Sequence, residues 1–252
     1  VAVTLTGDHT LDETLQALEA AGHEIDHHQL DDRYDLAGEF FRWEFAVAVA
    51  GALLAVNPFD EPDVVSSKQT TRRLLEGKKE EQANSIGEIR DDAGLTLRMP
   101  ISLVDEDAGL SGQLLRFFQN AGPTNYLTLM PFLYMTDDVQ NALSELITAL
   151  RAVLPLPVIL NPGPRYLHST GQLHKGGSNT GLYLIITAST DTMLAIPGEP
   201  YSFSDLNNAQ ASGDFLSLAA LDRQVAHLDL GSSPQQALAA VTAEVQLRWT
   251  ES

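Results

Sequence analysis

The residues best suited to chemistry lie together between Asn161 and Gly181, where the sequence reads NPGPRYLHSTGQLHKGGSNTG. Histidines carry protons near neutral pH, arginine and lysine supply fixed positive charge, and glycine-rich backbone exposes N–H groups that bind anions. Hydroxyl and amide groups complete this set, whose members are Arg165, His168, Ser169, Thr170, Gln172, His174 and Lys175. A sugar phosphate requires this combination, so we interpret the stretch as a ligand loop. The alternative is a surface turn whose histidines only pack or cap.

Carboxylates that could act as a general base lie elsewhere in the chain. Glu39 and Glu44 belong to a strongly apolar segment, where burial would raise the pKa of a carboxyl group. A solvated helix start is the other interpretation of both residues. Glu199 lies in the turn sequence PGEPYSF, where it either serves as a base or caps the following helix.

No metal or organic cofactor is expected. His23, His27 and His28 are close in sequence, but residues along a strand alternate between its two faces. They are not accompanied by carboxylates at the spacing of a known zinc site, and the chain has no cysteine.

Composition narrows the function classes. The chain has 252 residues, 44% of them hydrophobic, which is enough for one large core or two modest ones. A formal net charge of -19 argues against general binding to nucleic acid or anionic membranes. No apolar run reaches the length of a membrane helix, and the lack of cysteine fits a reducing cytoplasm. Because the sequence begins at Val1 rather than methionine, we expect it to be part of a longer polypeptide.

Strand-like and helical segments alternate along the chain. Apolar runs predict strands at 1–5, 24–28, 95–97, 126–133, 157–160, 182–187 and 225–230, and amphipathic or capped segments predict helices at 11–22, 35–56, 62–76, 110–118, 137–153, 203–218 and 234–247. This alternation predicts an α/β protein with a layered, mostly parallel sheet flanked by helices. The helix at 35–56 is apolar on nearly all sides and is expected to lie in a core.

The segment 77–92 is rich in charge and poor in apolar residues, which is typical of a linker. We therefore expect one domain at 1–78, a charged linker at 79–93 and a second α/β domain at 94–252.

Three segments together resemble a known enzyme family. The run NPFDEPDV at 57–64, followed by Lys68, resembles the C-terminal signature of phosphoglucose isomerase. Together with GEFFRWEF at 38–45 and the ligand loop, it resembles the isomerase portion of bifunctional transaldolase/glucose-6-phosphate isomerases. The resemblance implies a sugar-isomerase (SIS) fold in both predicted domains, and interconversion of glucose 6-phosphate and fructose 6-phosphate through an enediolate.

The same resemblance assigns roles to individual residues. Lys68 matches the lysine near the sugar ring oxygen, and His168 or His174 matches the histidine that assists ring opening, with His168 in better register. Arg165 or Lys175 would supply charge for the phosphosugar. The family's Ser/Thr-rich phosphate pocket is not found and is expected upstream of Val1, unless Ser169 and Thr170 supply it. The expected partner is a second copy of the chain in a homo-oligomer, or the remainder of a longer polypeptide.

The chain also departs from the family pattern. Glu61 and Asp63 replace the usual glutamine and glycine, and the histidine segment follows the lysine instead of preceding it. The family's Glu-Ser segment, which supplies the base, is not found and is expected upstream of Val1; within the chain, Glu199 is the candidate. A noncatalytic sugar-phosphate-binding or dimerisation module is the alternative function, and a metal-dependent isomerase is a weaker one.

Overall fold

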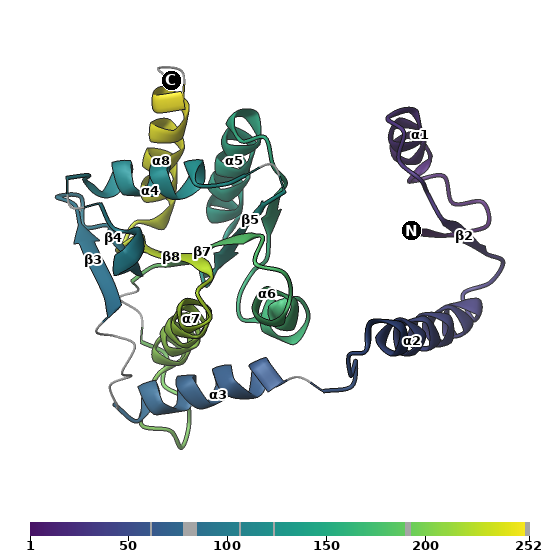
Figure 1. Ribbon diagram of the computed structural model, residues 1–252, viewed down its shortest axis with the longest axis horizontal. Helices are drawn as coiled ribbons and strands as arrows, with labels where there is room; N and C mark the ends of the chain where they lie inside the picture. Colours follow the sequence, from purple (N-terminus) through teal and green to yellow (C-terminus); the bar gives the residue numbers. More distant parts are fainter. Residues whose placement is uncertain (61, 78–84, 106, 123, 190–192, 250–252) are drawn as a thin grey trace. The chain divides into compact units, whose positions relative to one another are not determined.

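The computed structural model describes residues 1–60, 62–77, 85–105, 107–122, 124–189 and 193–249 (Figure 1). The chain divides into two compact units, Val1–Asp60 and Glu61–Ser252, which we call unit 1 and unit 2. Each unit is described by itself.

Unit 1 is a small βαβα arrangement. Strands β1 (Ala2–Leu5) and β2 (His27–Leu30) pair in parallel, and helix α1 (Asp12–Ala20) connects them. Helix α2 (Asp35–Leu54) follows β2. Within unit 1, α2 buries only Glu39 and Gly51, while its apolar side chains are exposed. The prediction that α2 lies in a core is therefore wrong for unit 1, because its short strand pair offers too little surface to cover the helix.

Unit 2 is built on a six-stranded sheet in the order β3-β4-β8-β7-β5-β6. Its strands are β3 (Ile86–Arg90), β4 (Thr96–Pro100), β5 (Tyr126–Pro131), β6 (Val158–Leu160), β7 (Gly181–Thr187) and β8 (Gln224–Asp229). Strands β8, β7, β5 and β6 are mutually parallel, whereas β3 pairs antiparallel with β4 and β4 antiparallel with β8. The central strand β7 is buried along its whole length because helices cover both faces of the sheet.

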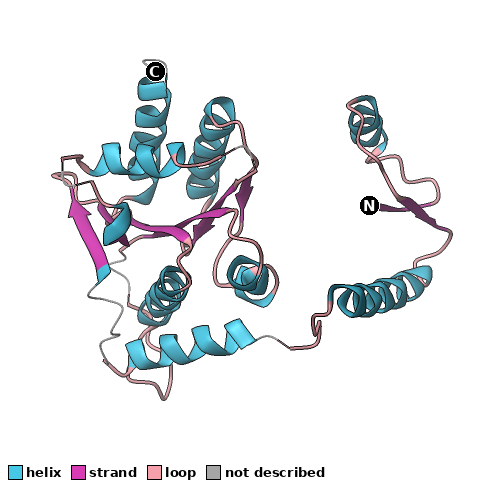
Figure 2. Cartoon of the chain, viewed as in Figure 1, coloured by secondary structure: helices cyan, strands magenta, loops and turns pink. Residues whose placement is uncertain are grey.

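Helices form a layer on each face of this sheet (Figures 1 and 2). Helices α4 (Leu110–Gln119), α5 (Asp137–Val153) and α8 (Pro234–Trp249) cover one face and enclose the larger apolar core. Helices α3 (Pro62–Leu75), α6 (Gly171–Gly176) and α7 (Phe203–Ala220) lie on the other face. Here the core is smaller and rich in aromatic rings, including Phe132, Tyr166, Tyr183 and Phe215.

The predicted α/β class with a mostly parallel sheet flanked by helices is confirmed. The observed division of the chain differs from the predicted one: it falls after Asp60, and α3 belongs to unit 2 because it packs along α7. Strand β3 also occupies part of the segment predicted as a linker. Ile86 and Ile89 are partly buried there, which is sufficient for an edge strand; residues 78–84 lie outside the described part of the chain.

Candidate functional site

The predicted ligand loop connects the carboxyl end of β6 to β7. It folds into a short 3-10 helix, η3 (Arg165–His168), followed directly by α6. The backbone N–H groups of Asn161 and Gly163 donate to the carbonyl groups of Leu129 and Pro131 on β5, at 2.9 Å each. Loops at the carboxyl ends of parallel strands are the usual ligand sites of α/β folds. The loop is therefore placed where the sequence predicted.

A buried ionic cluster fixes the loop to α7. Asp214 on α7 is 1% exposed, and its two carboxylate oxygens accept hydrogen bonds from the Lys175 ammonium and the Tyr166 hydroxyl. Lys175 is 4% exposed, so all three groups are withdrawn from solvent. Burial, followed by the adjacent Asp214 charge, raises the pKa of Tyr166 well above its usual value. Tyr166 is thus a neutral donor, and Lys175 is the counterion that a buried carboxylate requires.

Side chains from elsewhere in unit 2 donate hydrogen bonds to the carbonyl groups at the C-terminus of α6. Arg223 donates from one guanidinium nitrogen to the carbonyls of Lys175 and Gly177, the latter at 2.8 Å. The Tyr183 hydroxyl on β7 donates to the His174 carbonyl at 3.2 Å. These bonds satisfy carbonyl groups that a helix leaves unpaired at its C-terminus.

His174 lies inside the protein. It is 2% exposed, and its ring lies 5.8 Å from that of Tyr166 and 5.0 Å from that of Tyr183, measured between ring centres. Burial lowers its pKa to about 4, so the imidazole is neutral at pH 7. Its Nδ1 atom has no hydrogen-bond partner within the described chain. His174 and Lys175 were candidates for catalysis and substrate binding, but both are buried: Lys175 pairs with Asp214, and the His174 ring packs beside the Tyr166 and Tyr183 rings.

The outward side of the loop carries the remaining candidates. Arg165, His168 and Ser169 are exposed, and Thr170 and Gln172 are partly buried. The Ser169 hydroxyl donates to the Tyr166 carbonyl at 3.3 Å, which holds it close to the loop backbone. The structure therefore divides the loop into an inner half that anchors it and an outer half, centred on His168, that solvent reaches.

Lys68 lies on a helix that contacts this loop. The Lys68 side chain is exposed on α3, whereas that of the preceding residue, Ser67, is buried. The packed side of the helix therefore includes Ser67, and Lys68 lies next to it on the solvent side. Helix α3 contacts both α6 and α7, on the same face of the sheet (Figure 1). Helix α3, which bears Lys68, thus contacts α6, and α6 in turn contacts η3, which bears His168.

Glu199 is placed in the connection before α7. It is exposed and forms a side-chain hydrogen bond with Tyr201. Desolvation, together with this bond, raises the pKa of Tyr201, and the positive charge of Arg72 on α3 opposes the rise. Arg72 follows Lys68 by one helical turn, so the two cations share one side of α3. Tyr201, the partner of Glu199, is therefore within electrostatic range of α3.

The sequence interpretation missed Asp214, Tyr166 and Arg223. A signal for Asp214 was present, because it lies three residues after Ala211 and four before Leu218, both apolar and both buried. That spacing places Asp214 on the apolar stripe of α7. A carboxylate in such a position requires a cation, and Lys175 supplies it.

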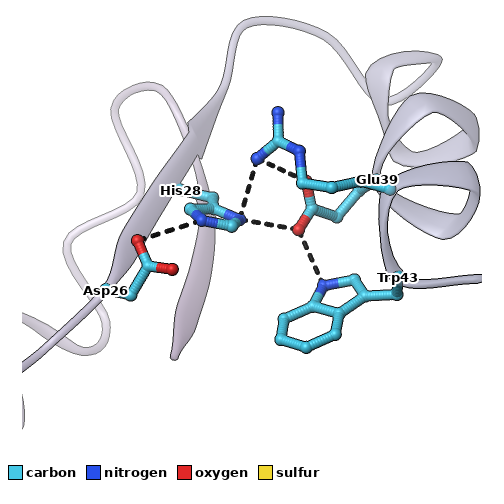
Figure 3. A network of polar contacts seen from close by, with 5 residues as sticks. Asp26, His28, Glu39 and Trp43 are labelled. Carbon is cyan, nitrogen blue, oxygen red and sulfur yellow. Dashed lines mark hydrogen bonds and ion pairs between the residues drawn. The ribbon is translucent and has the colours of Figure 1, made fainter. Parts of the chain in front are cut away.

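A second polar network lies in unit 1 (Figure 3). The His28 ring is held between Glu39 Oε1, 2.7 Å from Nδ1, and Asp26 Oδ1, 3.0 Å from Nε2. The Trp43 indole N–H donates to the same Glu39 oxygen at 2.8 Å, and Arg42 forms an ion pair with the other oxygen at 3.1 Å. The bond from His28 lowers the pKa of Glu39. The hypothesis that Glu39 is a base with a raised pKa is therefore wrong, because its hydrogen-bond donors outweigh its burial.

This network predicts a pH dependence for unit 1. The hydrogen bond to Glu39 raises the pKa of His28, so its stabilising effect is complete below about pH 6.5 and is lost as pH rises through the higher folded value. The pKa of Glu39 is lowered in the folded state, so the stabilisation that Glu39 contributes is lost as pH falls through that value. In a Trp249→Phe background, Trp43 fluorescence should change above pH 6.5, and His28→Gln should abolish that change. His23→Gln is the control; an alkaline transition that survives His28→Gln contradicts the assignment.

No group of three or more His, Asp or Glu side chains that could hold a metal ion occurs within the described ranges. None of the helices described there has the length and apolarity needed to cross a membrane.

Comparison with known proteins gives limited similarity. No family model matches the chain, and no curated protein matches it. The crystal structure of a hypothetical protein from Thermus thermophilus is similar with a TM-score of 0.47 and 16% sequence identity. The similarity covers 59% of this chain and 42% of that protein, so the chain spans less than half of its length.

Proposed function

We propose that this chain is part of a glucose-6-phosphate isomerase, which interconverts glucose 6-phosphate and fructose 6-phosphate by an enediolate proton transfer. The sequence resemblance motivates the proposal. The observation that supports it best is the packing of α3 on α6, since it brings the element bearing Lys68 next to the loop bearing His168. Both side chains are exposed on these elements, as contact with a soluble substrate requires.

The chemistry of the outer site residues suits this reaction. Ring opening requires that the ring oxygen gains a proton and that the anomeric hydroxyl loses one. An exposed imidazole such as that of His168 can transfer these protons. The Lys68 ammonium can stabilise negative charge that develops on the ring oxygen and then on the enediolate. Arg165 can bind the phosphate by paired hydrogen bonds.

The isomerisation itself requires a carboxylate that takes the proton from C2 of glucose 6-phosphate and returns it to C1. Glu199 is the candidate within this chain, since it is exposed and its partner Tyr201 is within electrostatic range of Arg72 on α3. Ser169 and Gln172 lie on the same loop as His168 and are candidates for binding the sugar hydroxyls.

Kinetics of two variants test the proposal. Lys68→Ala and His168→Ala in the full-length protein should each lower kcat/KM for fructose 6-phosphate by about 100-fold or more, as expected for loss of a group that acts on the transition state. His23→Ala, which removes an exposed histidine of unit 1, is the control and should keep wild-type activity. Unchanged kcat/KM in both test variants would end the assignment.

Calorimetry separates the isomerase from a noncatalytic sugar-phosphate-binding module. Glucose 6-phosphate should bind to the full-length protein and be converted. Binding that depends on Arg165 without any conversion would favour the module instead.

A further inference from the structure

We infer that two adjacent residues of α7, Gly213 and Asp214, are positioning residues that set the separation of Lys68 and His168. This inference rests on the proposed function. Gly213 fixes the approach of α3, and Asp214 fixes the loop that contains His168. Neither residue is exposed, so each acts through the element that it contacts.

Gly213 allows α3 and α7 to pack closely. A Cβ atom at this position would lie 2.7 Å from Thr71 Oγ1 and 3.2 Å from the Thr71 backbone nitrogen. The first distance is shorter than atoms allow and the second is tight against backbone, so a larger residue must displace α3. Thr71 follows Lys68 by three residues on the same helix. Any displacement of α3 at this contact therefore moves Lys68.

Asp214 fixes the loop segment that contains His168. Its carboxylate accepts from Tyr166 within η3 and from Lys175 within α6, which tethers the loop on both sides of His168. Tyr166 is only two residues from His168. Since Gly213 and Asp214 are consecutive in one helix, a single turn of α7 determines the positions of both candidate catalytic groups.

The first test changes the α3 contact. Gly213→Ala should lower kcat about tenfold while KM stays within about twofold, because shifts well below 1 Å at reacting groups cost rate more than binding. Thr71→Ala removes the hydroxyl that the new methyl would meet at 2.7 Å but keeps the backbone contact at 3.2 Å, so the double variant should recover part of the lost kcat. Gly38→Ala is the control, since a Cβ there meets nothing within 4 Å.

The second test changes the loop contact. Tyr166→Phe removes one tether and leaves the Lys175–Asp214 pair, and it should also lower kcat with little change in KM. Tyr126→Phe is its control, because it removes a tyrosine hydroxyl bond, to Tyr183 at 3.0 Å, that lies outside the Asp214 cluster. A general loss of stability would affect both tyrosine variants alike, whereas a positioning effect is confined to Tyr166.

Different results would overturn the positioning role of Gly213 and Asp214 and the proposed isomerase function. Wild-type kcat in folded Gly213→Ala and Tyr166→Phe, together with strong losses in Lys68→Ala and His168→Ala, overturns the positioning role alone. Equal losses in Gly213→Ala with and without Thr71→Ala overturn it as well. Full activity of Lys68→Ala and His168→Ala instead overturns the proposed function, and the positioning role with it.

Discussion

Lys175→Met should destabilise unit 2 by roughly 3–5 kcal/mol, because it leaves the Asp214 carboxylate buried without its cation. Asp214 and Lys175 are 1% and 4% exposed, so solvent cannot replace the lost partner. Urea unfolding followed by far-UV circular dichroism measures the change. Lys68→Met provides the control, since removal of an exposed lysine should change the free energy of unfolding by at most about 0.5 kcal/mol.

A paired variant identifies the cause. Lys175→Met with Asp214→Asn removes both charges and retains an acceptor for the Tyr166 hydroxyl. It should recover much of the stability lost in Lys175→Met, because the cost arises from an unpaired charge and not from lost packing. A double variant as unstable as the single one contradicts the ionic role of the cluster.

Acid should destabilise unit 2 between about pH 6.5 and pH 4. Burial lowers the pKa of both His174 and His227 to about 4, whereas in the unfolded chain each titrates near 6.5. The unfolded state therefore binds more protons in this range, and acidification favours unfolding. Between about pH 6.5 and pH 4, the protonation of each histidine should lower the free energy of unfolding by a few kcal/mol.

The measurement is the urea midpoint at several pH values between 7 and 4. His174→Gln and His227→Gln should each flatten the pH dependence, because glutamine takes up no proton. His168→Gln replaces the exposed histidine and should leave the wild-type slope unchanged. Equal slopes in all three variants would show that buried histidines do not control the acid transition.

Local sequence signals predicted most elements of the fold. Helix α5 has the predicted bounds because Thr136 accepts a hydrogen bond from the Val139 N–H at its start and its apolar residues recur at helical spacing. Strands such as β7 were equally clear as short apolar runs. By contrast, β3 was missed because it is an edge strand whose alternate residues are charged.

Burial was harder to predict than secondary structure. The apolar sequence of α2 predicted a core helix, but Phe41 is 69% exposed because unit 1 has little surface to cover it. For unit 2, the segment predicted to bind a ligand connects two strands, β6 and β7, as its sequence indicated. Its division into anchoring and exposed residues was not predicted, since Lys175 depends on Asp214, which is 39 positions away.

The central claim is that Lys68 and His168 serve sugar isomerisation, and solvent isotope exchange tests it most directly. Fructose 6-phosphate incubated with the full-length protein in D2O should yield glucose 6-phosphate that carries deuterium at C2, detected by proton NMR, because the enediolate is reprotonated by a group that exchanges with solvent. Both the product and the label should fall about 100-fold or more in Lys68→Ala and His168→Ala. Absence of glucose 6-phosphate from the wild-type reaction, or unchanged product and label in both variants, would contradict the account.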